Sequence, residues 1–355
     1  MNLESKLATI IKKATKKCPH LQVYIQSEAL NNPFIHSLNG PKQAFHSASV
    51  GKLATAFIII RYIERQLISF DTAIHSILDA KILHNLFVFR GIDYANKVTV
   101  FHLLGHTSGI NDYFEGITDD RKSILDIVMK QPDHFFSPEE LVQYTATKQK
   151  AVGKPGEKFL YSDTGYILLG LIIEKIAKKP FFEVLREEVF NPLGMKETAL
   201  IGYDSIAKQE HLAPVIVKKQ DIRLYKSLSI DFSGGGLITT LEDLSKLVNG
   251  LTNRQFISQS SFDKMATFEH HFNAGMFYGL GLMELRFEKF FFLLKGLPRY
   301  YGHLGVLGVH AWVDPKTGDT IIINVSDMNK MVASFNLLIS LTIEIYKHQK
   351  EKREH

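Results

Sequence analysis

The sequence contains very little cysteine, which limits the ways in which it can be stabilised. Cys18 is the single cysteine among 355 residues, so the chain cannot form an internal disulfide bond. A chain of this length buries a large core without disulfides or a structural metal. Hydrophobic residues make up 45% of the chain and charged residues 22%, which is ordinary for a globular protein. The cysteine content therefore gives no indication of an oxidising compartment.

Long hydrophobic runs are also missing. The first twenty residues lack the unbroken apolar segment of a secretory signal. Instead, Leu3, Leu7 and Ile11 recur at helical spacing with lysines on the opposite side, which predicts a docked helix with a solvated basic face. A membrane-surface helix is the alternative. Residues 166–176 are the most apolar stretch, but a glycine and a glutamate interrupt them. We therefore expect no membrane span and a soluble, cytoplasmic protein.

Signals for nucleic acid, nucleotide or metal binding are weak. The net charge is only +5, and the lysines are scattered without the interleaved aromatics of a nucleic-acid groove. The pair Gly51-Lys52 lacks the upstream glycine of a phosphate-binding loop. His102 and His106 are four residues apart, as metal ligands can be, but no third ligand follows at a zinc-like spacing. We expect neither a nucleic-acid partner nor a metal or other cofactor, and the oligomeric state is left open.

Hydrophobic periodicity predicts an α+β fold. Strand-like patterns lie near both ends of the chain around a mostly helical middle, and regular βα alternation is absent. This implies an antiparallel sheet assembled from both termini and flanked by helices. We expect an α/β lobe from residues 1–70 and 215–355, a mostly helical lobe from residues 71–214, and a site between them. The expected strands are 21–27, 33–38, 277–285, 289–294, 306–314 and 320–325, and the main expected helices are 50–68, one from residue 241, and 331–347.

A serine followed three residues later by a lysine suggests nucleophilic chemistry at Ser49 and Lys52. Residues three apart lie on one helical face, so the lysine can reach the hydroxyl, and a partly buried lysine can act as a base. The spacing alone is weak evidence, because it also occurs at Ser205–Lys208 and Ser261–Lys264. Ser49 differs from the other two serines because a long apolar helix follows it. We place Ser49 at the N-cap of that helix.

Two further elements follow Ser49 in order. Tyr161-Ser162-Asp163 lies in a glycine-containing loop that leads into an apolar helix, and a tyrosine there can serve as a general acid or base. The plainer reading of the tyrosine is a packed aromatic residue. His303-Leu304-Gly305 would let the backbone approach a substrate at a sheet edge. A literal Lys-Thr-Gly at residues 316–318 follows Asp-Pro, which predicts a hairpin turn rather than a site.

Together these residues resemble the serine β-lactamase and penicillin-binding-protein superfamily, which combines an SxxK motif, a Tyr or Ser motif, and KTG or HxG. The tyrosine and HxG elements suggest its class C-like branch, which includes esterases, D-amino-acid peptidases and amidases. The resemblance covers most of the chain and implies a β-lactamase/transpeptidase-like fold. Its other matching segments are 45–56 (FHSASVGKLATA), 98–113 (VTVFHLLGHTSGINDY), 189–198 (VFNPLGMKET) and 233–247.

The resemblance also implies roles for individual residues. Ser49 would be acylated, while Lys52 and Tyr161 would share proton transfer. Asp163, His303 and Gly305 would line the substrate site. The backbone N–H groups of Ser49 and Val306, the latter on the strand after Gly305, would form the oxyanion hole.

Two departures from the family pattern bear on the substrate. Asp163 stands where β-lactamases usually have an asparagine, and a carboxylate cannot donate a hydrogen bond unless it is protonated. His303 replaces a fixed positive charge with a side chain that is mostly neutral at pH 7. Both changes favour a hydrolase of small esters, amides or peptides. The alternatives are a β-lactamase or D,D-peptidase and, from another class, a binding protein that retains the fold without catalysis.

Overall fold

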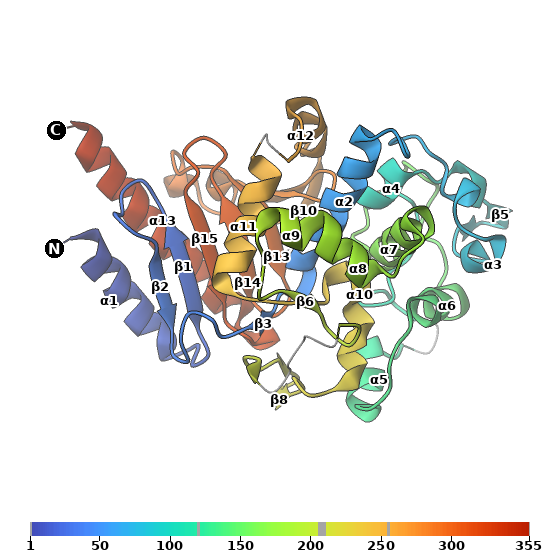
Figure 1. Cartoon of the computed structure of the whole chain (residues 1–355), viewed down its shortest axis with the longest axis horizontal. Helices are drawn as coiled ribbons and strands as arrows, with labels where there is room; N and C mark the ends of the chain where they lie inside the picture. The colour runs from blue at the N-terminus through green and yellow to red at the C-terminus, as the bar shows by residue number, and fades with distance from the viewer. Residues whose placement is uncertain (1, 119–120, 205–210, 254–255, 355) are drawn as a thin grey trace.

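A large antiparallel sheet forms the centre of the protein. The computed structural model describes residues 2–118, 121–204, 211–253 and 256–354, and within them this sheet has eight strands (Figure 1). Their spatial order is β10 (His270–Asn273), β11 (Met276–Tyr278), β12 (Met283–Leu285), β13 (Tyr300–Gly305), β14 (Val309–Val313), β15 (Thr320–Asn324), β1 (Gln22–Gln26) and β2 (Phe34–Ser37).

The two ends of the chain meet within this sheet. Strand β1 pairs with β15 on one side and with β2 on the other, so Tyr24 lies opposite both Ile322 and Ile35. The prediction of an antiparallel sheet assembled from both termini is therefore confirmed, as is the α+β class.

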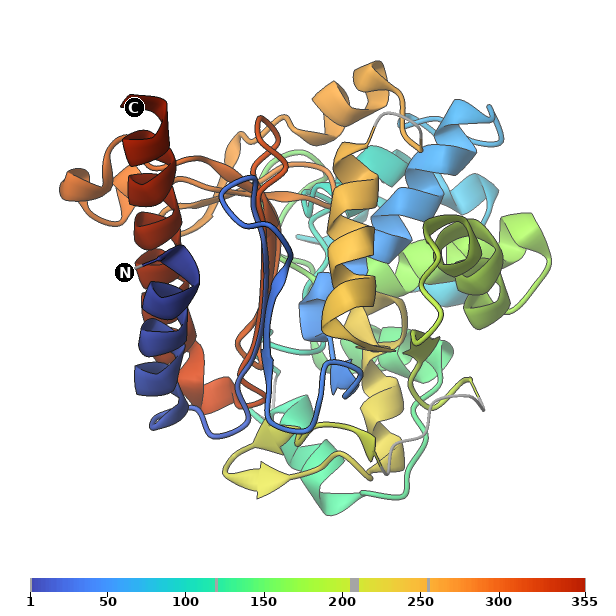
Figure 2. The same cartoon turned by 60° about the vertical axis from the view of Figure 1, so that its left-hand side comes forward.

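Helices cover both faces of the sheet. Helices α1 (Leu3–Thr15) and α13 (Met331–Glu354) pack together on one face, and α11 (Leu241–Thr252) and α2 (Lys52–Glu64) lie on the other (Figure 2). Because helices cover both of their faces, the central strands β14 and β15 are buried at every position and lack the alternation of a half-exposed strand. The predicted N-terminal helix is confirmed, with its apolar residues Leu3, Leu7 and Ile11 buried.

Helix α7 (Asp163–Ala177) is the central element of the helical region. Its first eleven residues are all buried, as expected of a helix that is apolar on every side. The hydroxyl of Ser162 caps it by accepting the Gly165 N–H, and Lys178 ends it in the left-handed conformation. The helices that pack against it are α2, α4 (Val100–Leu104), α6 (Pro138–Lys148), α8 (Phe181–Leu185) and α10 (Phe232–Gly235). Helix α2 also contacts α11, which packs on the large sheet, so α2 connects the helical region to the sheet.

The remaining elements are short. They are α3 (Ala80–Leu83), β4 (Val88–Phe89), β5 (Ile92–Asp93), α5 (Ile124–Lys130), α9 (Asn191–Leu193), β7 (Ile216–Val217), β8 (Gln220–Asp221), α12 (Gln259–Met265), and a small sheet of β3 (Phe45–His46), β9 (Leu237–Thr239) and β6 (Ala199–Leu200).

The predicted helix 50–68 has different ends in the structure. Ser49 is not an N-cap residue, because it lies inside a 3₁₀ turn, Ala48–Gly51, and α2 begins only at Lys52. Both kinds of helix place residues three apart on the same side, so apolar periodicity does not distinguish them. The helix ends at Glu64, and two residues later Gln66 adopts a positive φ of 59° that turns the chain away.

Several predicted strands also needed correction. Residues 277–285 form two strands joined by a turn in which Gly281 has positive φ, rather than one strand. The prediction for 289–294 is wrong, since this segment forms 3₁₀ turns in which Phe291, Phe292 and Leu293 are exposed. Strand β14 starts at Val309, so Val306 lies in a turn after β13 and not on a strand. The predicted turn at residues 314–318 is present between β14 and β15.

The division into lobes at residues 70 and 214 stays a prediction. Over the described ranges, no helix combines the length and the apolar character needed to cross a membrane.

Candidate active site

The predicted nucleophile and its lysine lie together at the start of α2. The Lys52 Nζ is 3.2 Å from the Ser49 Oγ. Ser49 is partly exposed, whereas Lys52 is fully buried. The spacing of three residues produces this contact as expected, because the 3₁₀ turn continues directly into the helix.

This turn is held against the glycine-rich segment 233–236. Ser47, Lys52 and Thr55 each donate a side-chain hydrogen bond to one of three consecutive carbonyls in that segment. The two backbones touch, since a Cβ added to Gly51 would lie 2.9 Å from the Gly235 Cα. The glycines therefore permit a close approach that fixes the position of Ser49.

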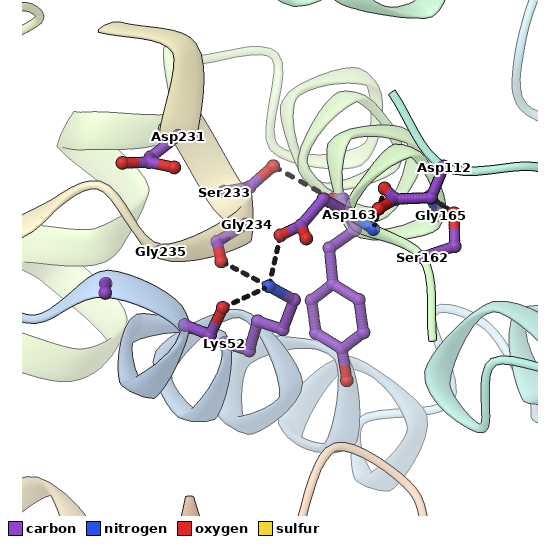
Figure 3. Close-up of polar contacts among 12 residues, drawn as sticks. Lys52, Asp112, Ser162, Asp163, Gly165, Asp231, Ser233, Gly234 and Gly235 are labelled. Atoms are coloured by element: carbon purple, nitrogen blue, oxygen red, sulfur yellow. Dashed lines mark hydrogen bonds and ion pairs between the residues drawn. The ribbon is translucent and has the colours of Figure 1, made fainter. Parts of the chain in front are cut away.

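The Lys52 Nζ has two further partners besides Ser49. It forms an ion pair with the Asp163 carboxylate at hydrogen-bond distance and donates to the Gly234 carbonyl at 2.6 Å (Figure 3). Asp163 is the first residue of α7, and its side chain is only 8% exposed. Asp163 thus enters the site as predicted, but its carboxylate is already engaged by Lys52.

The Tyr161 ring packs against the Lys52 amine. The Lys52 Nζ lies 4.9 Å from the centroid of the Tyr161 ring, which also packs on His106 and Tyr278. Burial, and secondarily the Asp163 charge, raises the pKa of Tyr161 well above its usual range, so the phenol keeps its proton at neutral pH. Among the described residues its hydroxyl has no hydrogen-bond partner of good geometry, although Ser49 is near enough to oppose the rise in pKa.

His303 is buried in β13 behind Tyr161. Its Nδ1 is 2.8 Å from the Leu304 carbonyl and therefore carries the proton, while its Nε2 accepts from the Tyr278 hydroxyl at 3.3 Å. Burial, followed by the Lys52 charge, lowers the pKa of His303 to about 3. His303 is thus neutral at pH 7, and its two hydrogen bonds hold it against the aromatic cluster.

Gly305 and Val306 bring the end of β13 next to the nucleophile turn, which is the 3₁₀ turn Ala48–Gly51 that contains Ser49. A Cβ added to Gly305 would lie 2.7 Å from the Ser47 carbonyl, so only glycine allows this approach. Val306 follows directly and lines a pocket that Ser49 also lines. The structure therefore brings all seven predicted site residues into one region. They are Ser49, Lys52, Tyr161, Asp163, His303, Gly305 and Val306.

Two acidic residues of this region were not singled out from the sequence. Asp112 accepts the backbone N–H of Asp163 at 2.8 Å, and burial, together with the Asp163 charge, raises the pKa of Asp112 to about 7. Asp231 lies on the other side of the glycine-rich segment (Figure 3), and burial raises its pKa to about 7 as well. Both residues are far from Asp163 in sequence, and no local pattern marked them.

Of the other two Ser-x-x-Lys pairs, only Ser261–Lys264 is described by the structure, and it does not form such a site. Ser205–Lys208 lies outside the described residues. The Ser261 hydroxyl accepts a hydrogen bond from Ser258. Lys264 instead lies over the Phe101 ring, with 5.4 Å from its Nζ to the ring centroid. Ser261 and Lys264 therefore show no mutual contact.

An apolar pocket of about 40 Å³ adjoins Ser49. Eleven of its lining residues are apolar, whereas Asp163 and Asp231 are its only acidic ones among the described residues. The apolar residues are Ala48, Phe114, Leu125, Val128, Val215, Val217, Ile222, Leu228, Ile230, Val306 and Leu307. The pocket can therefore take an apolar group of a molecule whose reactive atom lies at Ser49.

His102 and His106, whose spacing resembles that of metal ligands, have other hydrogen-bond partners. The Nδ1 of His102 contacts Thr99, and the Nδ1 of His106 accepts the Ser162 N–H. In the described part of the chain, no group of three or more His, Cys, Asp or Glu residues is placed to hold a metal ion.

Comparison with known families agrees with this fold. A family model described as Beta-lactamase matches residues 37–338, which is most of the chain. The chain therefore belongs to the Beta-lactamase family, and the predicted membership of the superfamily is confirmed. Penicillin-binding protein 4* of Bacillus subtilis (strain 168) is 32% identical over 162 residues, which cover 43% of this chain and 30% of that protein. The match thus spans about a third of the relative's length.

Solved structures share the whole fold. D-amino acid amidase from Ochrobactrum anthropi SV3, complexed with L-phenylalanine amide, superposes with a TM-score of 0.79 at 20% identity, covering 99% of this chain and 100% of that one. A D-stereospecific amidohydrolase from Streptomyces sp. gives a TM-score of 0.75 at 21% identity, with coverage of 93% and 97%. At this identity the likeness shows the β-lactamase/transpeptidase-like fold.

Proposed function

We propose that the protein is a serine hydrolase that forms an acyl-enzyme on Ser49 and hydrolyses small esters or amides. One observation carries the proposal: a fully buried lysine amine lies 3.2 Å from the hydroxyl of a partly exposed serine beside an apolar pocket. A nucleophile and a base in contact are the minimum that acyl transfer requires.

The partners of Lys52 suggest how it acts as the base. The Asp163 carboxylate and the Gly234 carbonyl can only accept hydrogen bonds, whereas the Ser49 hydroxyl can also donate one. To act as the base, the Lys52 ammonium must first give up one proton; its amine can then donate to the first two groups and present its lone pair to the Ser49 O–H. When Ser49 attacks a carbonyl carbon, its proton passes to Lys52, and Asp163 stabilises the resulting ammonium ion.

Tyr161 is suited to act as the general acid. Because its pKa is raised, Tyr161 is protonated at neutral pH and suited to give a proton to the leaving group. Lys52 then returns its proton to Tyr161, and water hydrolyses the acyl-enzyme. The N–H groups of Ser49 and Val306 would bind the oxyanion. In this scheme Asp163 positions Lys52 instead of binding the substrate's amide, and neutral His303 leaves the site without a second fixed positive charge.

The test is a panel of p-nitrophenyl esters, amino-acid amides and the β-lactam nitrocefin, measured with the wild type and Ser49→Ala. We expect ester and amide turnover that Ser49→Ala abolishes and Ser261→Ala leaves intact. Turnover that survives Ser49→Ala would contradict the proposal. The likeness to a penicillin-binding protein makes a β-lactamase or D,D-peptidase the second candidate. Nitrocefin turnover comparable to that of the esters would favour it.

A further inference from the structure

Asp231 places a carboxylate in the wall of the apolar pocket beside Ser49. It lies at the end of a 3₁₀ segment, Lys226–Asp231, directly before α10, and its side chain is 21% exposed. Leu228 and Ile230 of the same segment also line the pocket. A carboxylate among apolar groups is costly unless it is paired or hydrogen-bonded.

The basic side chain within ion-pair distance of Asp231 supplies neither a charge nor a hydrogen bond. The His46 Nε2 lies 3.3 Å from the Asp231 Oδ2. The Nδ1 of His46 accepts the Ala48 N–H at 3.0 Å, so the proton of the neutral ring is on Nε2, which has no hydrogen-bond partner among the described residues. Burial lowers the pKa of His46 to about 4, so the ring is uncharged at neutral pH.

Asp163, the other acidic residue that lines the pocket, does have a charged partner. Asp163 forms an ion pair with the Lys52 ammonium, whereas among the described residues His46 is the only basic side chain within ion-pair distance of Asp231. Asp231 therefore lines the pocket without a charged partner, and its side chain stays partly exposed there. A cation entering the pocket would find there an acceptor without a charged partner.

We propose that Asp231 binds a primary ammonium group on the acyl part of the substrate, so that the enzyme selects amino-acid esters and amides over their des-amino analogues. This inference rests on the proposed function, because it assumes that the acyl group lies in the pocket beside Ser49. The apolar side chain of the amino acid would contact the wall formed by residues such as Leu125 and Val128, while the ammonium ion pairs with Asp231.

The test compares alanine p-nitroanilide, in both configurations, with propionyl p-nitroanilide, which lacks only the amino group. For at least one configuration we expect kcat/KM to exceed that of the propionyl compound by tenfold or more. Asp231→Asn keeps the shape of the side chain but removes its charge. It should abolish this preference while changing turnover of the propionyl compound by less than about threefold. Equal losses on both substrates, or a preference that survives the substitution, would overturn the inference.

Asp126→Asn is the matched control. Asp126 lies on α5 between two residues that line the pocket, but its own side chain forms an exposed ion pair with Lys218 at 2.6 Å. The same chemical change there should leave the substrate preference intact. A loss of preference in this control would show that Asp231 has no special role.

A binding experiment separates this inference from the proposed function. Ser49→Ala cannot turn over substrate by the proposed route, so calorimetry can measure its affinity for alanine p-nitroanilide. We expect Ser49→Ala/Asp231→Asn to bind this compound at least tenfold more weakly and the propionyl compound equally well. This result supports the ammonium site even if the wild type proves inactive. Unchanged affinity would reject the site, whatever the activity measurements show.

Discussion

Replacing Lys52 with methionine should destabilise the protein strongly, because it leaves a buried carboxylate without its counter-ion. Lys52 is fully buried and the Asp163 side chain is 8% exposed, so water cannot take over the lost interactions. The substitution also removes the donor to the Gly234 carbonyl. Breaking a buried ion pair by removing one partner costs about 3–5 kcal/mol. We expect the free energy of unfolding in urea to fall by that amount.

A second substitution shows whether the charge itself is the cause. Lys52→Met/Asp163→Leu replaces the pair with apolar side chains of similar size, an exchange that is often neutral or even stabilising. We expect the double variant to recover at least half of the loss. Lys175→Met is the control, since Lys175 pairs with Asp79 at the surface, where both side chains are about half exposed or more. It should cost less than about 1 kcal/mol. A single variant as stable as the wild type, or a double variant no better than the single one, would refute this reasoning.

Three other predictions concern neighbouring residues. Because burial raises the pKa of Asp112 to about 7, the folded protein holds a proton that the unfolded chain releases. Stability should therefore fall as the pH rises from about 4 to 7, and urea unfolding of Asp112→Asn should show a flatter pH dependence. An unchanged slope would contradict this. In Gly235→Ala the new Cβ would lie 2.4 Å from the Ala48 carbonyl and displace the nucleophile turn. We expect ester turnover to fall at least tenfold while the circular dichroism spectrum stays native, and full activity would contradict the tight contact. Tyr161→Phe should lower kcat on amides by about 10²–10⁴-fold but far less on p-nitrophenyl esters, whose leaving group needs no proton. Equal losses on both substrates would argue against Tyr161 as the acid.

The sequence predicted the architecture and the main site residues because their signals are local or follow a known family pattern. The spacing of Ser49 and Lys52 gave their contact, and the apolar run after Ser162 gave a buried helix. Boundaries were less predictable. The pattern around Ser49 fits a 3₁₀ turn as well as an α-helix, and the close contact with Gly235 that accompanies the turn comes from a distant part of the chain.

Partners that are remote in sequence could not be predicted. Asp163 was expected to face the substrate, but whether its carboxylate meets substrate or Lys52 depends on how α7 lies against α2. Asp112 and Asp231 carry no local signature, because their effect on the site comes from burial near Asp163. The exposed apolar turns near residue 291 were wrongly predicted as a strand, since hydrophobic composition alone does not show whether a residue is buried.

The central claim is that Ser49 is the nucleophile, and covalent labelling tests it most directly. The wild type and Ser49→Ala would be treated with a fluorophosphonate, followed by intact mass measurement and mapping of the modified peptide. We expect one adduct per chain, located on Ser49, and none on Ser49→Ala, while Ser261→Ala labels like the wild type. An adduct on a different serine, or no adduct on folded wild-type protein that hydrolyses esters, would contradict it.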